Sequence, residues 1–170
     1  FIRAAIAKAN LHSFDRILDN GFRNITTSTK PINTAADLQG FKIRVPVSPL
    51  WTSMFKAFGA APTGINFSEV YSALQTKVVE GQENPLAIID IAKFYEVQKY
   101  LNLTGHVIVP IMIMMNAKAY NPMPDADKAA FKAAFAAGAK VNDDLTRADE
   151  ARLVDFFKEK GMTIVNSDRD

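Results

Sequence analysis

Apolar positions along the chain change from one spacing to another, and each change marks an expected element. Residues 41–45 (FKIRV) alternate apolar and polar side chains, which predicts a strand that Pro46 ends. From Pro49 to Gly59 the apolar residues recur every three or four positions, which predicts a helix with Ser48 as its cap. A strand that passes directly into a helix is typical of an α/β fold.

A second helix and a third strand-to-helix passage follow. Asn66 and Glu69 form an N-x-x-E pattern typical of a helix start, and an apolar face continues from Val70 towards a stop at Gly81. Residues 81–85 (GQENP) again form a strand-like exit into a helix that starts with proline. The asparagine of this segment, Asn84, has two possible roles, a helix cap or a ligand contact, and the local pattern leaves both open.

The remaining elements follow from the same rules. Residues 107–115 (VIVPIMIMM) are almost uninterrupted apolar residues, which predicts a strand buried on both faces, although Pro110 disfavours a single regular strand. Beyond Pro124, helical spacing continues to about Lys160, as one long helix or as two helices broken near 142–144. Further helices are expected over 1–11, 34–38 and 85–94, and further strands over 13–19, 22–29, 100–104 and 162–165.

Composition excludes several classes of function. The 170 residues carry 20 basic and 18 acidic side chains without a basic run, so no nucleic-acid partner is expected. No apolar run has the ~18 residues of a membrane span. The absence of cysteine excludes zinc–thiolate sites, thiol nucleophiles and disulfides.

Catalysis is supported only by isolated residue types. His12 and His106 have no catalytic partner nearby in the sequence, and Glu80 and Glu83 form at most a possible acid–base pair. No nucleophile, metal-ligand or phosphate-loop motif accompanies them. We therefore expect a binding protein that is not an enzyme and that uses no metal and no cofactor.

Arg44 is the candidate binding residue that the pattern itself indicates. It lies near the end of a predicted strand and close to a predicted helix start, where backbone N–H groups and the helix dipole favour an anion. A guanidinium offers two parallel donors to a carboxylate. The alternative is an ordinary strand arginine exposed to water.

Three motifs together resemble one protein family. Residues 42–46 (KIRVP), 67–75 (FSEVYSALQ) and 81–85 (GQENP) are similar in order and spacing to the solute-binding subunit, the DctP family, of tripartite ATP-independent periplasmic (TRAP) transporters. The similarity extends from about Gly21 to the end of the chain. The resemblance is specific because three separate motifs keep one register.

This resemblance implies an architecture and a function. The fold would be α/β and periplasmic binding protein-like, with one near-complete lobe, part of a second lobe, and the ligand between lobes. The protein would be a periplasmic receptor that binds a small organic acid through its carboxylate and delivers it to TRAP membrane subunits. The alternatives are a ligand-sensing domain of a regulator and an α/β enzyme that uses Glu80 and Glu83.

The resemblance also implies roles for particular residues. The arginine matching Arg44 pairs with the carboxylate, the residues matching Asn84 and Phe67 position the ligand, and the arginine matching Arg23 joins the carboxylate site. The segment between Arg23 and Pro31 is one residue longer than in sialic-acid-binding members. We therefore expect Arg44 to be the principal anchor.

The same resemblance divides the chain and indicates a fragment. The expected parts are the end of a first-lobe segment (1–20), the ligand-binding lobe with the carboxylate site (21–109), the return into the first lobe (110–150) and the start of a closing segment of the second lobe (151–170). Apolar residues that then lack covering partners, including Phe131 and Phe135, favour self-association of the fragment.

Overall fold

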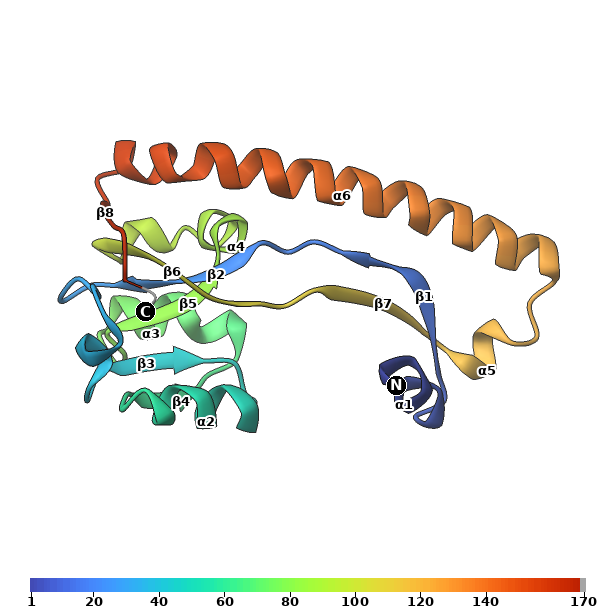
Figure 1. Ribbon diagram of the computed structural model, residues 1–170, viewed down its shortest axis with the longest axis horizontal. Helices are drawn as coiled ribbons and strands as arrows, with labels where there is room; N and C mark the ends of the chain where they lie inside the picture. Colours follow the sequence, from blue (N-terminus) through green and yellow to red (C-terminus); the bar gives the residue numbers. More distant parts are fainter. Residues whose placement is uncertain (169–170) are drawn as a thin grey trace. The chain divides into compact units, whose positions relative to one another are not determined.

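The computed structural model describes residues 1–168, which form two compact units (Figure 1). The smaller unit comprises residues 1–21 and 109–148. The larger unit comprises residues 22–108 and the described residues from Asp149 onward. Strands and helices alternate along most of the chain, as an α/β fold requires.

The larger unit is built on a mixed six-stranded sheet with the order β4-β3-β5-β2-β6-β8. β3 pairs in parallel with β4 and β5, β2 pairs antiparallel with β5 and β6, and β8 pairs in parallel with β6. The strands are β2 (Phe22–Thr27), β3 (Lys42–Val45), β4 (Ala61–Gly64), β5 (Gly81–Pro85), β6 (Tyr100–Ile108) and β8 (Thr163–Val165).

Short helices connect these strands, and the end of a long helix completes the unit. They are η1 (Ala35–Leu38), α2 (Pro49–Ala57), η2 (Phe67–Glu69), α3 (Val70–Gln75), α4 (Leu86–Ile91), η3 (Phe94–Glu96) and the last part of α6 (Asp125–Glu159).

The pairing register separates two apolar cores. Ile25 of β2 pairs with Asn102 of β6, and Thr26 pairs with Leu101. Because neighbouring residues of a strand point to opposite faces, Ile25 and Leu101 lie on opposite faces of the sheet. The core around Ile25 contains residues of η1, β3 and α2, whereas the core around Leu101 contains residues of α3, α4 and α6.

This arrangement singles out the carboxyl ends of β3 and β5. The two strands are neighbours, yet α2 follows β3 on one face of the sheet and α4 follows β5 on the other. In open α/β sheets such a switch leaves a crevice outside the carboxyl ends of the two strands, where ligands bind. Arg44 lies on β3 and Asn84 on β5, each one residue from the end of its strand.

The smaller unit contains a two-stranded antiparallel sheet of β1 (Leu11–Leu18) and β7 (Ile111–Asn116), with α1 (Ile2–Lys8), α5 (Ala117–Tyr120) and most of α6. Asp143 Oδ1 accepts a hydrogen bond from the backbone nitrogen of Asp19 at 2.8 Å, and Asn142 Nδ2 donates to the Asp19 carbonyl at 2.7 Å. These polar residues tie α6 to the end of β1 and do not break it, so the single long helix is the correct alternative.

Three local expectations are wrong. The apolar face from Val70 does not reach Gly81, because α3 ends at Gln75 and Lys77 adopts a positive φ of 60°. Ser48 and Asn66 occupy N-cap positions without a side-chain capping bond. Residues 107–115 are not one strand buried on both faces.

The apolar run is instead divided between β6 and β7. Val109 and Pro110 separate the two strands, as the missing donor of proline predicts. β7 pairs with β1 alone, and Met114 of β7 is 47% exposed. A two-stranded sheet leaves more of each strand uncovered than a larger sheet does. No helix among residues 1–168 combines the length and apolar character needed to cross a bilayer.

Candidate functional site

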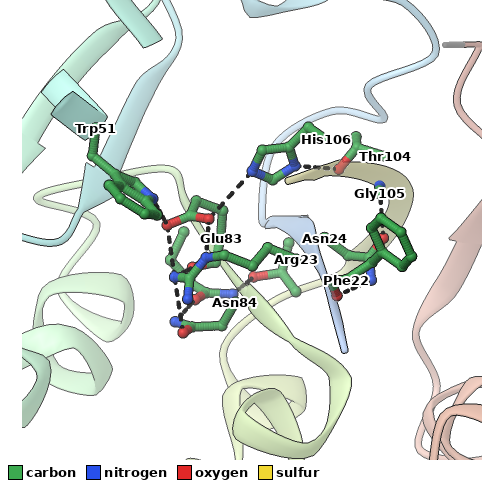
Figure 2. Close-up of polar contacts among 11 residues, drawn as sticks. Phe22, Arg23, Asn24, Trp51, Glu83, Asn84, Thr104, Gly105 and His106 are labelled. Atoms are coloured by element: carbon green, nitrogen blue, oxygen red, sulfur yellow. Dashed lines mark hydrogen bonds and ion pairs between the residues drawn. The ribbon is translucent and has the colours of Figure 1, made fainter. Parts of the chain in front are cut away.

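A buried carboxylate, that of Glu83, lies at the centre of a cluster of polar side chains in the larger unit (Figure 2). Arg23 donates to it twice, from Nε to Oε2 at 2.5 Å and from Nη2 to Oε1 at 2.8 Å. Trp51 Nε1 donates to Oε1 at 2.9 Å, and His106 Nε2 lies 3.2 Å from Oε2. Glu83 is fully buried, so these groups replace the water that would otherwise solvate its charge.

Strand register and helix placement explain this convergence. Arg23 of β2 pairs with Pro85, and Ile25 pairs with Glu83, so Arg23 and Glu83 are diagonal neighbours on one face of the sheet. α2, which carries Trp51, packs on the same face through its core contacts with Ile25. The site therefore depends on pairing between segments that are far apart in the sequence.

Hydrogen bonding also determines the tautomer of neutral His106. An ionised carboxylate only accepts, so Nε2 must carry the hydrogen that faces Glu83. Nδ1 then accepts from the hydroxyl of Thr104, which lies 2.8 Å away. The ring also contacts Phe55 edge-on, with a centroid distance of 5.5 Å.

Glu83 is a fixed negative charge and is poorly suited to proton transfer. Burial by itself raises the pKa of Glu83, but hydrogen bonds from His106 and Arg23, together with the charge of Arg23, outweigh burial and leave the pKa below its ordinary value. A carboxylate with a lowered pKa stays ionised near neutral pH and is a weak base.

Arg44 is buried beside this cluster and has a different kind of partner. Its Nε and Nη2 donate to the carbonyl of Ile65 at 2.9 and 2.7 Å, and the residue is 3% exposed. Burial lowers the pKa of Arg44, while the charge of Glu83 opposes this effect and the charge of Arg23 adds to it. A guanidinium nevertheless stays protonated in proteins.

The two arginines keep hydrogen-bonding capacity. Within residues 1–168, no hydrogen bond uses Nη1 of Arg23 or Nη1 of Arg44. The three buried charges also do not balance, since two guanidinium groups face one carboxylate and leave a net charge of +1 when His106 is neutral. One further carboxylate would balance this charge and could accept hydrogen bonds from the two Nη1 groups.

Asn84 belongs to the same cluster and does not cap the following helix. Its Oδ1 accepts from Arg23 Nη2 at 3.0 Å, and its Nδ2 donates to Gln82 Oε1 at 2.6 Å. The N-cap position of α4 is occupied by Pro85. The capping alternative is therefore wrong for Asn84.

Phe67 lies nearby in the chain but makes different contacts. It is the first residue of η2 and follows Ile65, the partner of Arg44, by two positions. Phe67 is 49% exposed, and its ring meets Phe94 edge-on with a centroid distance of 6.2 Å. The ring is thus open to further contact.

Two other candidates from the sequence, Glu80 and His12, have partners outside the Glu83 cluster. Glu80 and Glu83 do not share a partner, because the Glu80 carboxylate accepts from the Thr29 hydroxyl and the Lys42 backbone, each at 3.1 Å. His12 stacks on Tyr120 in the smaller unit, with ring centroids 3.6 Å apart. Residues 1–168 contain no group of His, Cys, Asp and Glu that could hold a metal ion.

Sequence reasoning missed the central position of Glu83 and the contributions of Trp51 and His106. The sequence indicates Glu83 only as an acid–base candidate, and it shows no partner for His106. The only signal in the sequence is that Arg23 and Glu83 share a face when Ile25 pairs with Glu83, whereas a register shifted by one residue would place them on opposite faces.

Comparison with known proteins identifies the family. Residues 2–170 match the family described as bacterial extracellular solute-binding protein, family 7, DctP. A solute-binding protein of Verminephrobacter eiseniae is 42% identical over 149 residues, which cover 88% of this chain and 44% of that protein. The sialic acid-binding periplasmic protein SiaP of Vibrio cholerae is 40% identical over 149 residues, covering 88% of this chain and 46% of that protein.

A crystal structure supports the same relationship. The TRAP periplasmic solute-binding protein of Roseobacter denitrificans with bound L-galactonate has a TM-score of 0.92 and 37% identity, covering 99% of this chain and 56% of that chain. The present chain thus spans about half the length of the relatives it matches. By family match and identity, it belongs to the DctP family of TRAP solute-binding proteins.

Proposed function

We propose that this chain supplies the carboxylate-binding part of a periplasmic receptor for a small organic acid. The whole protein would deliver the acid to the membrane subunits of a TRAP transporter. The observation that carries the proposal is the uncompensated charge at the ends of β3 and β5. Two buried arginines and one buried glutamate leave room for one more negative charge and offer two Nη1 groups to bind it.

Arg44 is the principal anchor in this proposal. The charge of Arg23 is already paired with Glu83 through two hydrogen bonds, at 2.5 and 2.8 Å. The partner of Arg44 is the neutral carbonyl of Ile65. A ligand carboxylate therefore gains more from Arg44, whose charge is not directly compensated, and Arg23 contributes a secondary contact.

The class of ligand is a sugar acid or a related hydroxy acid. Two of the named relatives bind sialic acid and L-galactonate, both of which join a carboxylate to a chain of hydroxyl groups. The half-exposed ring of Phe67 offers an apolar surface for the carbon side of such a ligand, and Asn84 offers an amide to its oxygen atoms. The larger unit would be the ligand-binding lobe, as the motif resemblance implied.

Binding without turnover is part of the proposal. Glu83 receives N–H groups from Arg23, Trp51 and His106, and its lowered pKa disfavours the protonated form that a general acid needs. His106 is held between Glu83 and Thr104. The cluster therefore has the chemistry of a binding site with one uncompensated positive charge, and it lacks a group suited to proton transfer.

Titration calorimetry of the whole protein with a panel of sugar acids and short hydroxy acids tests this function. We expect galactonate or another member of the panel to bind, and galactitol, the neutral polyol, not to bind. Arg44→Ala should raise the Kd for the acid by a hundredfold to several thousandfold, because loss of one partner of a buried pair costs ~3 to 5 kcal/mol.

Arg152→Ala is the matched control. Arg152 makes an exposed ion pair with Asp149 on α6, and this substitution should leave affinity unchanged. An Arg44→Ala affinity within about fivefold of the parent would remove Arg44 from the site. NMR spectroscopy of the mixture would detect chemical conversion of a bound acid, and such conversion would contradict the receptor function.

A further inference from the structure

A chain of side-chain hydrogen bonds runs from Arg23 into the interior of the larger unit. Arg23 Nη2 donates to Asn84 Oδ1 at 3.0 Å, and Asn84 Nδ2 donates to Gln82 Oε1 at 2.6 Å. Gln82 Nε2 donates to Thr26 Oγ1 at 2.9 Å, and the Thr26 hydroxyl donates to Gln98 Oε1 at 2.9 Å. In each of these hydrogen bonds the donor belongs to the residue nearer Arg23, and the acceptor belongs to the residue farther from it.

Both ends of this chain fix its direction. At one end Arg23 has only donors, so Asn84 must turn its oxygen towards it. At the other end Gln98 Nε2 donates at 3.0 Å to the carbonyl of Val97, which only accepts. Between two ends of fixed polarity, each amide and the hydroxyl has one orientation that satisfies all of its partners.

Burial makes the alternative orientations costly. Gln82 and Thr26 are fully buried, and Asn84 and Gln98 are each 5% exposed. Turning one amide over would place a donor against a donor and an acceptor against an acceptor, with little water to compensate. The strand register supports the geometry, because Gln82 and Thr26 lie directly opposite each other on β5 and β2.

The direction of the chain determines what Asn84 offers to a ligand. Its Oδ1 is engaged by Arg23, and one of its two amide hydrogens is engaged by Gln82. The amide hydrogen that remains is a donor. We propose that Thr26, Gln82 and Gln98 are positioning residues, which hold the Asn84 amide so that it donates an N–H to an oxygen atom of the bound acid.

This inference rests on the proposed function, because it takes Asn84 as a ligand contact. It adds a specificity rule to it. Arg23, Arg44 and Asn84 then all present donors, so the site favours ligand atoms that accept, such as carboxylate and hydroxyl oxygens. A ligand with an ammonium group at the same point would meet a donor and would be rejected.

Thr27 provides a matched control for a substitution of Thr26, although it lies outside the chain of hydrogen bonds. Thr27 follows Thr26 on β2 and is equally buried, and its hydroxyl donates to the Lys30 carbonyl at 2.5 Å. Thr26 belongs to the chain of hydrogen bonds that starts at Arg23, and Thr27 does not. Replacing each by valine removes one buried hydroxyl with little change of shape.

The first test measures galactonate affinity and stability in the whole protein. Thr26→Val and Thr27→Val should lower the urea midpoint by comparable amounts, but only Thr26→Val should raise the Kd, by about tenfold, as expected for one misdirected buried hydrogen bond. Thr26→Ser keeps the hydroxyl and should restore affinity. Equal Kd values for the two valine variants would overturn the inference while leaving the proposed function intact.

The second test needs no ligand. If galactonate does not bind the parent protein, that result counts against the proposed ligand class, and the second test still decides the inference. The side-chain amides of Asn84 and Gln82 are followed by NMR. In Thr26→Val their signals should shift and split or broaden as the amides sample a second orientation, and in Thr27→Val they should stay in place. Unmoved Asn84 and Gln82 signals in Thr26→Val would show that the chain does not orient Asn84. Should Thr26→Val fail to fold, Gln98→Met breaks the last side-chain link and must give the same pattern.

Discussion

Replacing Glu83 by glutamine tests whether the buried cluster is organised by charge. The substitution keeps the shape of the side chain and removes its charge. Arg23 and Trp51 present only donors to Glu83. The glutamine has one oxygen and one NH2 group, so either Arg23 Nε or the pair of Trp51 and Arg23 Nη2 loses its acceptor.

The expected loss of stability is large. The best arrangement keeps the glutamine oxygen on Trp51 and Arg23 Nη2 and turns the NH2 group towards His106, which changes its tautomer with the help of Thr104. Arg23 Nε is then unpaired, and two buried guanidinium groups remain without a counter-charge. Breaking a buried pair in this way costs ~3 to 5 kcal/mol, which corresponds to a fall in Tm of about 6 to 20 °C for a chain of this size.

The assay is urea unfolding, followed by circular dichroism and by fluorescence of Trp51. Trp51 is the single tryptophan of the chain and donates directly to Glu83, so its emission reports on the cluster itself. Glu80→Gln is the matched control, because the Glu80 carboxylate accepts from Thr29 and the Lys42 backbone outside the arginine cluster. We expect its cost to stay below ~1 kcal/mol.

Two outcomes would refute this reasoning. One is a Glu83→Gln free energy of unfolding within about 1 kcal/mol of the parent, which is the range of an exposed ion pair. The other is an equal cost for Glu83→Gln and Glu80→Gln. Either result would mean that the charge of Glu83 is not what holds Arg23 in place.

Two further predictions concern acid and self-association. The pKa of Glu83 is lowered in the folded protein, so its stabilisation is complete above its ordinary pKa of 4.5 and is lost as the pH falls through the lower folded value; the urea midpoint should drop below about pH 4.5, and Glu83→Gln should flatten this drop. The present chain should associate, because the smaller unit leaves Ile17, Met114 and Leu145 between 47% and 60% exposed. Light scattering that shows a monomer at high concentration, with no binding of an apolar dye, would contradict this second prediction.

Local patterns predicted most elements because their causes are local. Pro46 and Pro49 each act on their own segment, and β3 ends at Val45 while α2 begins at Pro49. The helix towards Gly81 was overestimated because Val78 continues the spacing of Val70, although the chain turns at Lys77 and exposes Val78. A periodic pattern does not show where tertiary structure stops using it.

The site could be predicted only in part, because its geometry is non-local. Motifs placed Arg44 and Asn84 near strand ends, and the structure brings Asn84 together with Arg23. The pairing of Arg23 with Glu83 requires the register between β2 and β5, which are more than fifty residues apart in the sequence. A shift of one residue would send Glu83 to the other face and leave it without Arg23.

The imbalance of buried charge has a physical consequence for how ligand binding and stability are linked. The like charges of Arg23 and Arg44 repel each other in the protein interior, and the charge of Arg23 contributes to lowering the pKa of Arg44. Glu83 compensates one of these charges, so a carboxylate that binds beside Arg44 relieves the remaining repulsion as well as making new hydrogen bonds. Because this relief is available only to an anion, a neutral sugar of the same shape gains the hydrogen bonds without the charge compensation. In the proposed receptor, this charge imbalance would therefore provide the discrimination between acids and neutral sugars.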